Sequence, residues 1–361
     1  RSQWNVLETA TAATLPVFRT IPAVQAALAS YGDAEVLAVI DEIRSHRAVA
    51  REPLRTAEFK QWISQRLETP GELPAAGDVF FARTAHGTTS GISGIEGISG
   101  IARVVLAAKL REVRVQIGFT RLEPVQPDLE GEFDLQVQSA PLSLSQDWLP
   151  AIEIRGEGVF LELDEEKVRA WEKRPEVRDR EGALRAGHAA WVATLNLTTN
   201  AKQPEFPGVR FYLLHSLSHL LLSAISLECG YAASAIRERL YCAPAEAETP
   251  MAAILLSTGS PGTEGTLGGL VDQGRNLKRH LERALELGAL CSNDPVCASH
   301  SPQNDYAERY LEGAACHGCL FLAESSCERF NRYLDRALVV PALGHPAELA
   351  FFGTGKETLG V

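Results

Sequence analysis

Residues 209–227 read VRFYLLHSLSHLLLSAISL, a segment that is apolar nearly all the way round a helix of 3.6 residues per turn. A helix of this kind must be buried, so the segment predicts the centre of a packed domain. Gly230 follows it and is expected to cap the helix, because glycine readily adopts the left-handed conformation found after helix C-termini.

Downstream of this centre, the pattern alternates between helices and a strand. Residues 234–241 (SAIRERLY), 270–287 and 325–338 are expected to be helices, and residues 252–256 (AAILL) a short buried strand. The glycine-rich stretch 259–269 is expected to be a turn between domains. Phosphate binding by its backbone N–H groups is the alternative, weakened because no Lys-Ser/Thr pair ends it.

Upstream, the periodicity predicts helices over residues 34–46, 56–67 and 101–116, the last with a basic face. Alternation predicts strands over 133–137 and 158–163. The acidic triplet Asp164-Glu165-Glu166 is expected to begin a helix, where carboxylates suit the positive end of the dipole. A magnesium site is the alternative for this triplet, but nothing nearby completes it.

These elements predict a mixed α+β, helix-rich fold. We expect an N-terminal helical region at 1–83, a connector with a mixed α/β, acidic region at 84–208, and a zinc-binding domain at 209–361. Glycine recurs at every third position over residues 91–100, which favours a turned connector over a phosphate loop, since no lysine follows.

Composition narrows the class of protein. Among 361 residues, 45% are hydrophobic and 22% are charged, as in globular proteins. The formal net charge of −11 disfavours strong independent binding to nucleic acid. The first residue is Arg1 and the only methionine is Met251, so we expect an excerpt of a longer chain. Neither a signal-peptide pattern nor a long apolar run is present, so we expect a cytoplasmic protein without a membrane span.

Seven cysteines all lie after residue 228, and five lie between 291 and 327. Without a secretory signal, such clustering suggests metal before disulfides. The pair Cys316-His317-Gly318-Cys319 places two thiolates beside one ion, and Cys297 and Cys327 could complete the tetrahedron that zinc prefers. Four sulfur ligands would make one structural zinc site, closed to water and substrate.

Several alternatives remain for these residues. The cysteines could be ordinary buried thiols, or the CxxC pair could be redox-active, although no thioredoxin-like context precedes it. Cys291 could replace Cys297 as a ligand. His300 and His317 are further candidate ligands, more in keeping with supporting roles. Cys229 and Cys242 are expected to be core or near-surface thiols.

His215 and His219 lie four residues apart on one helix, so their rings point the same way. This is metalloprotease spacing, but the intervening glutamate is replaced by Ser216-Leu217-Ser218. We therefore expect packed histidines hydrogen-bonded to backbone, with a catalytic zinc as the alternative. No catalytic constellation is recognisable, so we expect no enzymatic activity.

Six motifs in order give the chain a family resemblance. They are residues 215–219 (HSLSH), 228–231 (ECGY), 236–241 (IRERLY), 264–270 (EGTLGGL), 313–320 (GAACHGCL) and 324–331 (ESSCERFN). Together they resemble the MrfA zinc-binding (MZB) domain family, and within it the DrmB group of bacterial DISARM anti-phage systems. The resemblance covers about 209–340, with residues 109–114 (KLREVR) and 118–121 (GFTR) also similar. The sequence departs from the family pattern at Cys229, where serine is usual, and at Cys291, which is an additional cysteine.

The resemblance implies zinc ligands at Cys297, Cys316, Cys319 and Cys327. It also implies a non-enzymatic partner of a helicase-like ATPase, DrmA, in a complex that engages invading DNA. Six basic residues are candidate nucleic-acid contacts for such a complex, namely Arg103, Lys109, Arg111, Arg114, Arg237 and Arg239. The alternatives are an autonomous DNA-binding module, a helicase-accessory domain of a DNA-repair protein, and an enzyme that uses the histidine pair or the acidic segment.

Overall fold

The computed structural model describes residues 7, 9–48, 52–85, 99–116, 148–195, 203–230, 232–261, 269–302 and 309–353. The chain forms two compact units, Arg1–Pro53 and Leu54–Val361. The expected strand at 133–137 and most of the two glycine-rich stretches lie outside the described residues. No helix in the described ranges is both long enough and apolar enough to cross a membrane.

The N-terminal unit contains three described helices, α2 (Leu15–Phe18), α3 (Pro22–Ala27) and α4 (Asp33–Ala48). They share a small apolar core to which Leu15, Val24, Val36 and Ile40 contribute. The predicted helix at 34–46 is thereby confirmed.

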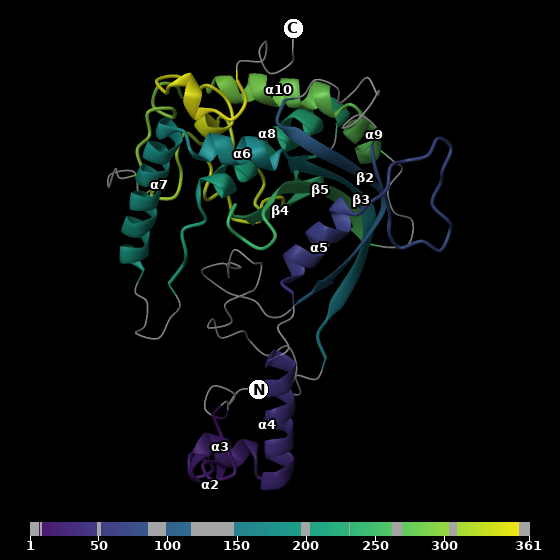
Figure 1. The fold of residues 1–361 in the computed structure, drawn as a ribbon, viewed down its shortest axis with the longest axis vertical. Helices are drawn as coiled ribbons and strands as arrows, with labels where there is room; N and C mark the ends of the chain where they lie inside the picture. The colour runs from purple at the N-terminus through teal and green to yellow at the C-terminus, as the bar shows by residue number, and fades with distance from the viewer. Residues whose placement is uncertain are drawn as a thin grey trace. The chain divides into compact units, whose positions relative to one another are not determined.

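The larger unit is built on a five-stranded antiparallel sheet (Figure 1). Its strands are β1 (Phe81–Thr84), β2 (Ile101–Val115), β3 (Ala151–Leu163), β4 (Ile236–Ala243) and β5 (Met251–Pro261). Their spatial order is β1-β2-β3-β5-β4. Strands from the middle and the C-terminal part of the chain therefore complete one sheet, which crosses the boundary that we expected at residue 208.

Both faces of this sheet are covered, as the alternation of its side chains requires. One face packs on α8 (Val209–Cys229) and α9 (Gly269–Arg275), with α10 (Leu277–Ala289) packed on α8, and the other face packs on α5 (Leu54–Ile63). The face that packs on α8 and α9 presents Val104, Leu106, Val159, Leu161, Ile254 and Leu256. The opposite face presents Val105, Phe160, Tyr241 and Leu255 to Phe59 and Trp62 of α5.

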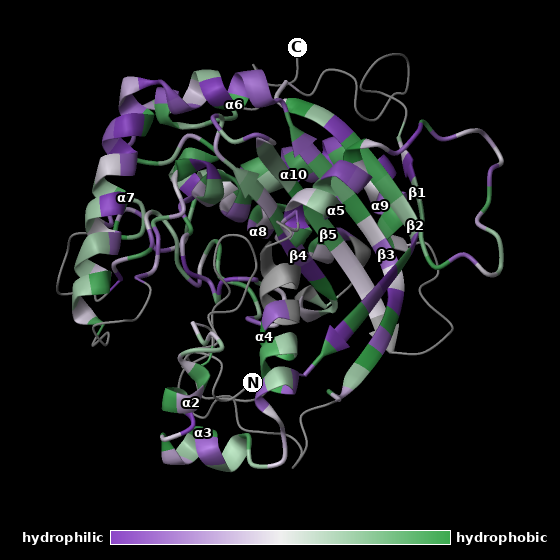
Figure 2. Cartoon of the chain, turned by 60° about the horizontal axis from the view of Figure 1, so that its bottom comes forward, coloured by the Kyte–Doolittle hydropathy of each residue, from purple (hydrophilic) through white to green (hydrophobic). Residues whose placement is uncertain are grey.

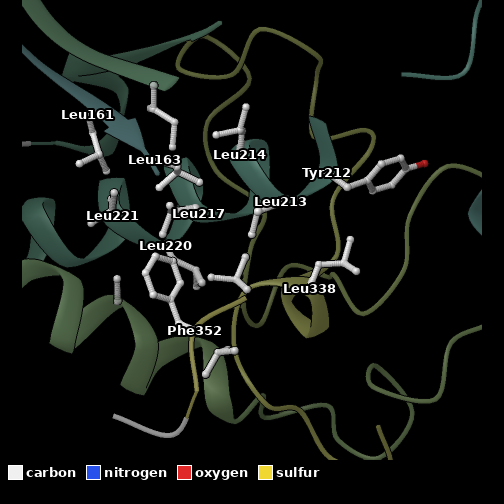
Figure 3. Close-up of a cluster of buried hydrophobic side chains, with 14 of the residues drawn as sticks. Leu161, Leu163, Tyr212, Leu213, Leu214, Leu217, Leu220, Leu221, Leu338 and Phe352 are labelled. Carbon is white, nitrogen blue, oxygen red and sulfur yellow. The ribbon is translucent and has the colours of Figure 1, made fainter. Parts of the chain in front are cut away.

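Helix α8 is the centre of the core, as residues 209–227 predicted. Figure 3 shows Leu161 and Leu163 of β3 beside leucines of α8, with Leu338 and Phe352 from the C-terminal part of the chain nearby. Gly230 ends the helix with φ of 68°, so the predicted left-handed cap is confirmed.

Two further helices, α6 (Glu165–Glu172) and α7 (Pro175–Thr194), follow β3 directly. Hydrophilic residues, purple in Figure 2, are frequent on both helices. Asp164 caps α6 by accepting hydrogen bonds from the backbone N–H groups of Glu166 and Lys167, at 3.0 and 3.2 Å. Buried Arg210 of α8 binds Glu165 and Glu172, each at 2.8 Å, and so ties α6 to the core. The acidic triplet therefore starts a helix, as expected.

Three predicted helices are wrong. Residues 101–116 and 234–241 contribute β2 and β4, because pairing with β3 and β5 overrides the helix propensity of their alanine, leucine and arginine residues. Residues 325–338 form turns with one short 3₁₀ helix, η3 (Arg336–Leu338). Two other 3₁₀ helices are η1 (Ala233–Ala235) and η4 (Ala347–Leu349), and the expected helix 270–287 is divided between α9 and α10.

The mixed α+β class is confirmed, as are helices at 56–67 and strands at 158–163 and 252–256 in slightly different bounds. The expected division at 1–83, 84–208 and 209–361 differs from the two compact units of the structure. The difference arises because the long antiparallel pairing of β3 with β5 joins the second and third expected regions.

Candidate metal centre

Four thiols converge beyond the C-terminal end of α10. Cys291 and Cys297 lie in the loop that follows this helix, and Cys316 and Cys319 form the CxxC pair. Their sulfur atoms all lie within 4.8 Å of one another. The Sγ–Sγ distance is 3.4 Å between Cys291 and Cys316 and 3.7 Å between Cys297 and Cys319. The two sulfur atoms of the CxxC pair are 3.8 Å apart.

These distances fit one tetrahedral zinc ion. Four sulfur atoms about 2.3 Å from a zinc ion would stand about 3.8 Å apart at the corners of a tetrahedron. A disulfide would bring two of them to about 2.05 Å, so the thiols are not paired covalently. Cys291, Cys297, Cys316 and Cys319 would therefore hold the ion, with no position left for water or substrate.

The first loop of the centre is organised by one carboxylate. Asp294 accepts hydrogen bonds from the backbone N–H groups of Cys291, at 2.9 Å, and Ala298, at 3.2 Å. Its partner is the fully buried guanidinium of Arg336, which also donates to the carbonyl of Gly288 at 2.8 Å. The pair thus fixes the loop that carries two thiols against the end of α10.

The CxxC turn is held by hydrogen bonds to sulfur. Burial opposes ionisation of Cys316, but hydrogen bonds from the Asn293 side chain and the Gly318 N–H outweigh it and lower the pKa of the thiol to about 7. A Cβ at position 318 would lie 2.7 Å from Ser292 Oγ, so any larger residue there would require the Ser292 side chain to move. The turn is therefore prepared to present Cys316 as a thiolate, the form that binds metal.

The structure brings together three of the four predicted ligands, namely Cys297, Cys316 and Cys319. The fourth thiol is Cys291, which the sequence offered only as a replacement for Cys297. Cys327 does not join them, because its loop turns back toward α8. There its sulfur accepts hydrogen bonds from the N–H groups of Arg329 and Asn331, at 3.3 and 3.2 Å.

The two histidines considered as extra ligands have other contacts. Buried His300 bonds through Nε2 to the carbonyl of Arg309 at 2.9 Å. The ring of His317 packs edge-on against Phe321, with centroids 4.9 Å apart. Neither belongs to the four-thiol cluster.

His215 and His219 are buried and hydrogen-bonded to backbone, as the sequence predicted. Nδ1 of His215 lies 3.3 Å from the carbonyl of Tyr333, and Nδ1 of His219 lies 2.8 Å from that of Leu320. Their other ring nitrogens face Glu238 and Cys327, which the sequence did not connect with them. The alternation of the strand 236–243 could have shown that Glu238 points toward α8, had these residues been taken for a strand.

The candidate nucleic-acid contacts mostly have local partners. Arg103, Arg111 and Arg239 pair with Glu162, Glu153 and Glu58 at 3.0, 2.9 and 2.6 Å. Arg114 pairs with Glu112, and Lys109 donates to the carbonyl of Ala75 at 2.6 Å.

Arg114 and Arg237 also line one small pocket on the sheet. Burial, and then the charge of Arg114, lower the pKa of Arg237. Whether any of the six basic residues contacts nucleic acid stays a prediction.

Comparison with known proteins identifies the region that carries the centre. Residues 217–320 match the family of the MrfA Zn-binding domain, MZB. The matched range contains all four clustered thiols and ends before Cys327. The resemblance seen in the sequence is thereby confirmed, and the four-thiol cluster lies within the matched range.

The chain is also similar to the DISARM protein DrmB of Bacillus paralicheniformis, with 37% identity over 245 residues. The match covers 67% of this chain and 41% of that protein, so the chain spans less than half of its relative. A crystal structure of the DUF1998 helicase MrfA bound to DNA shares 12% identity at a TM-score of 0.28, over 63% of this chain and 23% of that one. This last likeness is too weak to support an inference.

Proposed function

We propose that the chain is a non-catalytic, zinc-binding subunit of a bacterial anti-phage complex of the DISARM type. The observation that carries the proposal is the four-thiol cluster inside the MZB region of a chain similar to DrmB. Four thiolates saturate zinc, so the ion would have no vacant position at which to activate water. The ion would therefore hold the loops 291–298 and 316–319 in place rather than perform chemistry.

The partner that we propose is DrmA, a helicase-like ATPase, with which the chain would form a heterodimer in the cytoplasm. ATP hydrolysis would belong to that partner, and this chain would help to shape a path for foreign DNA. The acidic net charge supports this division of roles, because the chain alone repels phosphate at long range. Most of the candidate basic residues are paired with acidic side chains, and this pairing also supports a minor role for the chain alone in DNA binding.

Affinity capture tests the partnership. The chain is co-expressed with the helicase-like ATPase encoded beside its gene, and the capture of one through a tag on the other is measured. We expect a stable one-to-one complex whose DNA affinity exceeds that of either component alone. A chain that carries zinc and yet captures no ATPase would contradict the proposal.

An autonomous DNA-binding module is the second candidate, favoured by the pocket that Arg114 and Arg237 share. Glu112, which pairs with Arg114, also lines this pocket, so a phosphate there would be contacted mainly by Arg237. Filter binding of the isolated chain at moderate salt separates the candidates. The first predicts little retention of DNA, whereas the second predicts retention that falls steeply with salt and is lost in Arg237→Gln.

A further inference from the structure

A second group of metal-binding side chains lies in the core of the larger unit. It consists of His215 and His219 of α8, Glu238 of β4, and Cys327 of the loop that follows the CxxC turn. All four are buried, and their donor atoms lie within 4.8 Å of one another. Three parts of the chain that are distant in sequence thus meet at one point.

Backbone carbonyls fix the orientation of both imidazoles. Because each Nδ1 faces a carbonyl oxygen, of Tyr333 or of Leu320, each Nδ1 must carry the proton and donate it. In the neutral ring, Nε2 then carries a lone pair directed at the other members of the group. A hydrogen bond from one ring nitrogen to a carbonyl is also what orients histidine ligands in metal sites.

The two acidic members are held as acceptors. Glu238 receives hydrogen bonds from the hydroxyl of Ser218 and, at 3.0 Å, from the N–H of Glu328. The sulfur of Cys327 accepts hydrogen bonds from the backbone N–H groups of Arg329 and Asn331, at 3.3 and 3.2 Å. These donors orient both groups as acceptors within the cluster.

The donor atoms of the four side chains therefore direct lone pairs at one another. Nε2 of His215 lies 3.0 Å from Glu238 Oε1 and 3.1 Å from the sulfur of Cys327. Nε2 of His219 lies 3.4 Å from the same carboxylate oxygen, and in the described part of the chain no hydrogen bond satisfies it. One shared proton could bridge one of these contacts but would leave the other nitrogen unsatisfied in the core. A cation among the four atoms would satisfy all of them.

We propose that His215, His219, Glu238 and Cys327 bind a second divalent metal ion, zinc, distinct from the ion of the four thiols. Tetrahedral zinc with nitrogen, oxygen and sulfur ligands would separate neighbouring ligand atoms by about 3.3–3.6 Å, close to the observed contacts. One thiolate and one carboxylate also neutralise the charge of a divalent cation, which a buried site requires. Imidazole and thiolate together favour zinc over magnesium or calcium.

The family match covers residues 217–320, so it includes His219 and Glu238 of this second centre but excludes His215 and Cys327. It joins α8, β4 and the loop that carries Cys327, so its ion would be structural. The carbonyl bonded by His219 belongs to Leu320, the residue directly after Cys319. The two centres would thus hold the two ends of the same loop. The inference does not depend on DISARM or on any partner protein.

Metal content of the purified full chain tests the proposal. The protein is produced in zinc-supplemented medium, purified without chelator, and its zinc is counted by mass spectrometry. We expect about two zinc ions per chain in the unchanged protein, and the loss of one in Cys327→Ser and of the other in Cys316→Ser. The matched control Cys242→Ser should keep both. One ion per chain, or full occupancy in Cys327→Ser, would overturn the proposal.

X-ray absorption at the zinc edge gives a measurement that needs no variant and so does not depend on whether a variant folds. Two occupied centres would give an average of about 2.5 sulfur ligands per zinc, with the remainder nitrogen and oxygen. The thiol centre alone would give about four sulfur ligands and no imidazole scattering. The latter spectrum would mean that a shared proton, rather than a metal, joins the histidines to Glu238.

Discussion

Among single residues, Asp294 organises one loop of the four-thiol centre. Its carboxylate pairs with Arg336, whose side chain is fully buried, and accepts the backbone N–H groups of Cys291 and Ala298. We expect Asp294→Ala to lower the free energy of unfolding by about 3 kcal/mol, because it leaves a buried guanidinium without its counter-charge. Urea unfolding with zinc present measures this.

The control for this change is the exposed pair of Arg185 and Glu181 on α7, whose atoms are 3.0 Å apart. Glu181→Gln should cost less than about 1 kcal/mol, because water screens the pair. If both variants lost equal stability, the buried pair would not organise the loop.

His188 gives the molecule a predictable response to acid. It packs against Trp191, Phe206 and Tyr333, and burial, followed by the charge of Arg185, lowers its pKa. The folded state therefore binds fewer protons than the unfolded state, and stability is lost as pH falls through the unfolded pKa of 6.5 toward the lower folded value.

We expect His188→Phe to reduce the loss of unfolding free energy between pH 7.5 and 5.5 relative to the unchanged protein. Phenylalanine keeps the aromatic contacts but binds no proton, so it removes one of the groups that oppose folding in acid. Urea titrations of both proteins at the two pH values give the comparison. Parallel losses in the two proteins would show that His188 does not contribute.

The choice of ligands shows how far residue patterns could be interpreted. The CxxC spacing identified Cys316 and Cys319, because two thiolates three residues apart can meet one ion without help from the rest of the fold. Spacing led us to Cys327 as the fourth ligand, with Cys291 only as a replacement for Cys297, whereas the structure places Cys291 in the cluster and Cys327 outside it. Which cysteine joins the cluster depends on where the loop after Leu322 turns, and this turn is set by the side-chain amide of Asn331. The amide oxygen accepts from the N–H of Leu322 and the amide nitrogen donates to the carbonyl of Leu322, both at 2.9 Å.

Among the elements, α6 can be tested through its cap. Asp164 accepts two backbone N–H groups at the start of this helix, and the helix in turn carries Glu165 and Glu172 to buried Arg210. We expect Asp164→Ala to lower the free energy of unfolding by about 1 kcal/mol, and Asp164→Ser to cost less, because serine can also cap. Thermal or urea unfolding of the two variants distinguishes capping from a general effect of charge.

The elements also divide into those that the sequence could predict and those that it could not. Helix α8 and the strands β3 and β5 were predicted because burial on all sides, or alternation closed by a turn, leaves a pattern in the residues themselves. β2 and β4 were predicted as helices. Both contain good helix formers, and their strand conformation comes from pairing: β2 pairs with the distant β3, and β4 pairs with β5, the next strand along the chain.

For the whole larger unit, metal would connect the sheet core to the C-terminal loops. Residues 291–353 contain little regular secondary structure in their described part, only the short helices η3 and η4. We therefore expect their stability to come from side chains that reach into the core and from the metal that the thiols would bind. We therefore expect residues 291–353 to be the region most sensitive to removal of metal.

Removal of the metal should expose this region selectively. We expect Cys319→Ser, or a strong chelator added to the unchanged protein, to open residues 291–330 to protease while the sheet and α8 stay protected. The reason is that local opening occurs where few backbone hydrogen bonds and apolar contacts remain. Limited digestion, with fragments assigned by mass spectrometry, measures this, and Cys242→Ser serves as control. An unchanged digestion pattern after either treatment would mean that the loops are held without zinc.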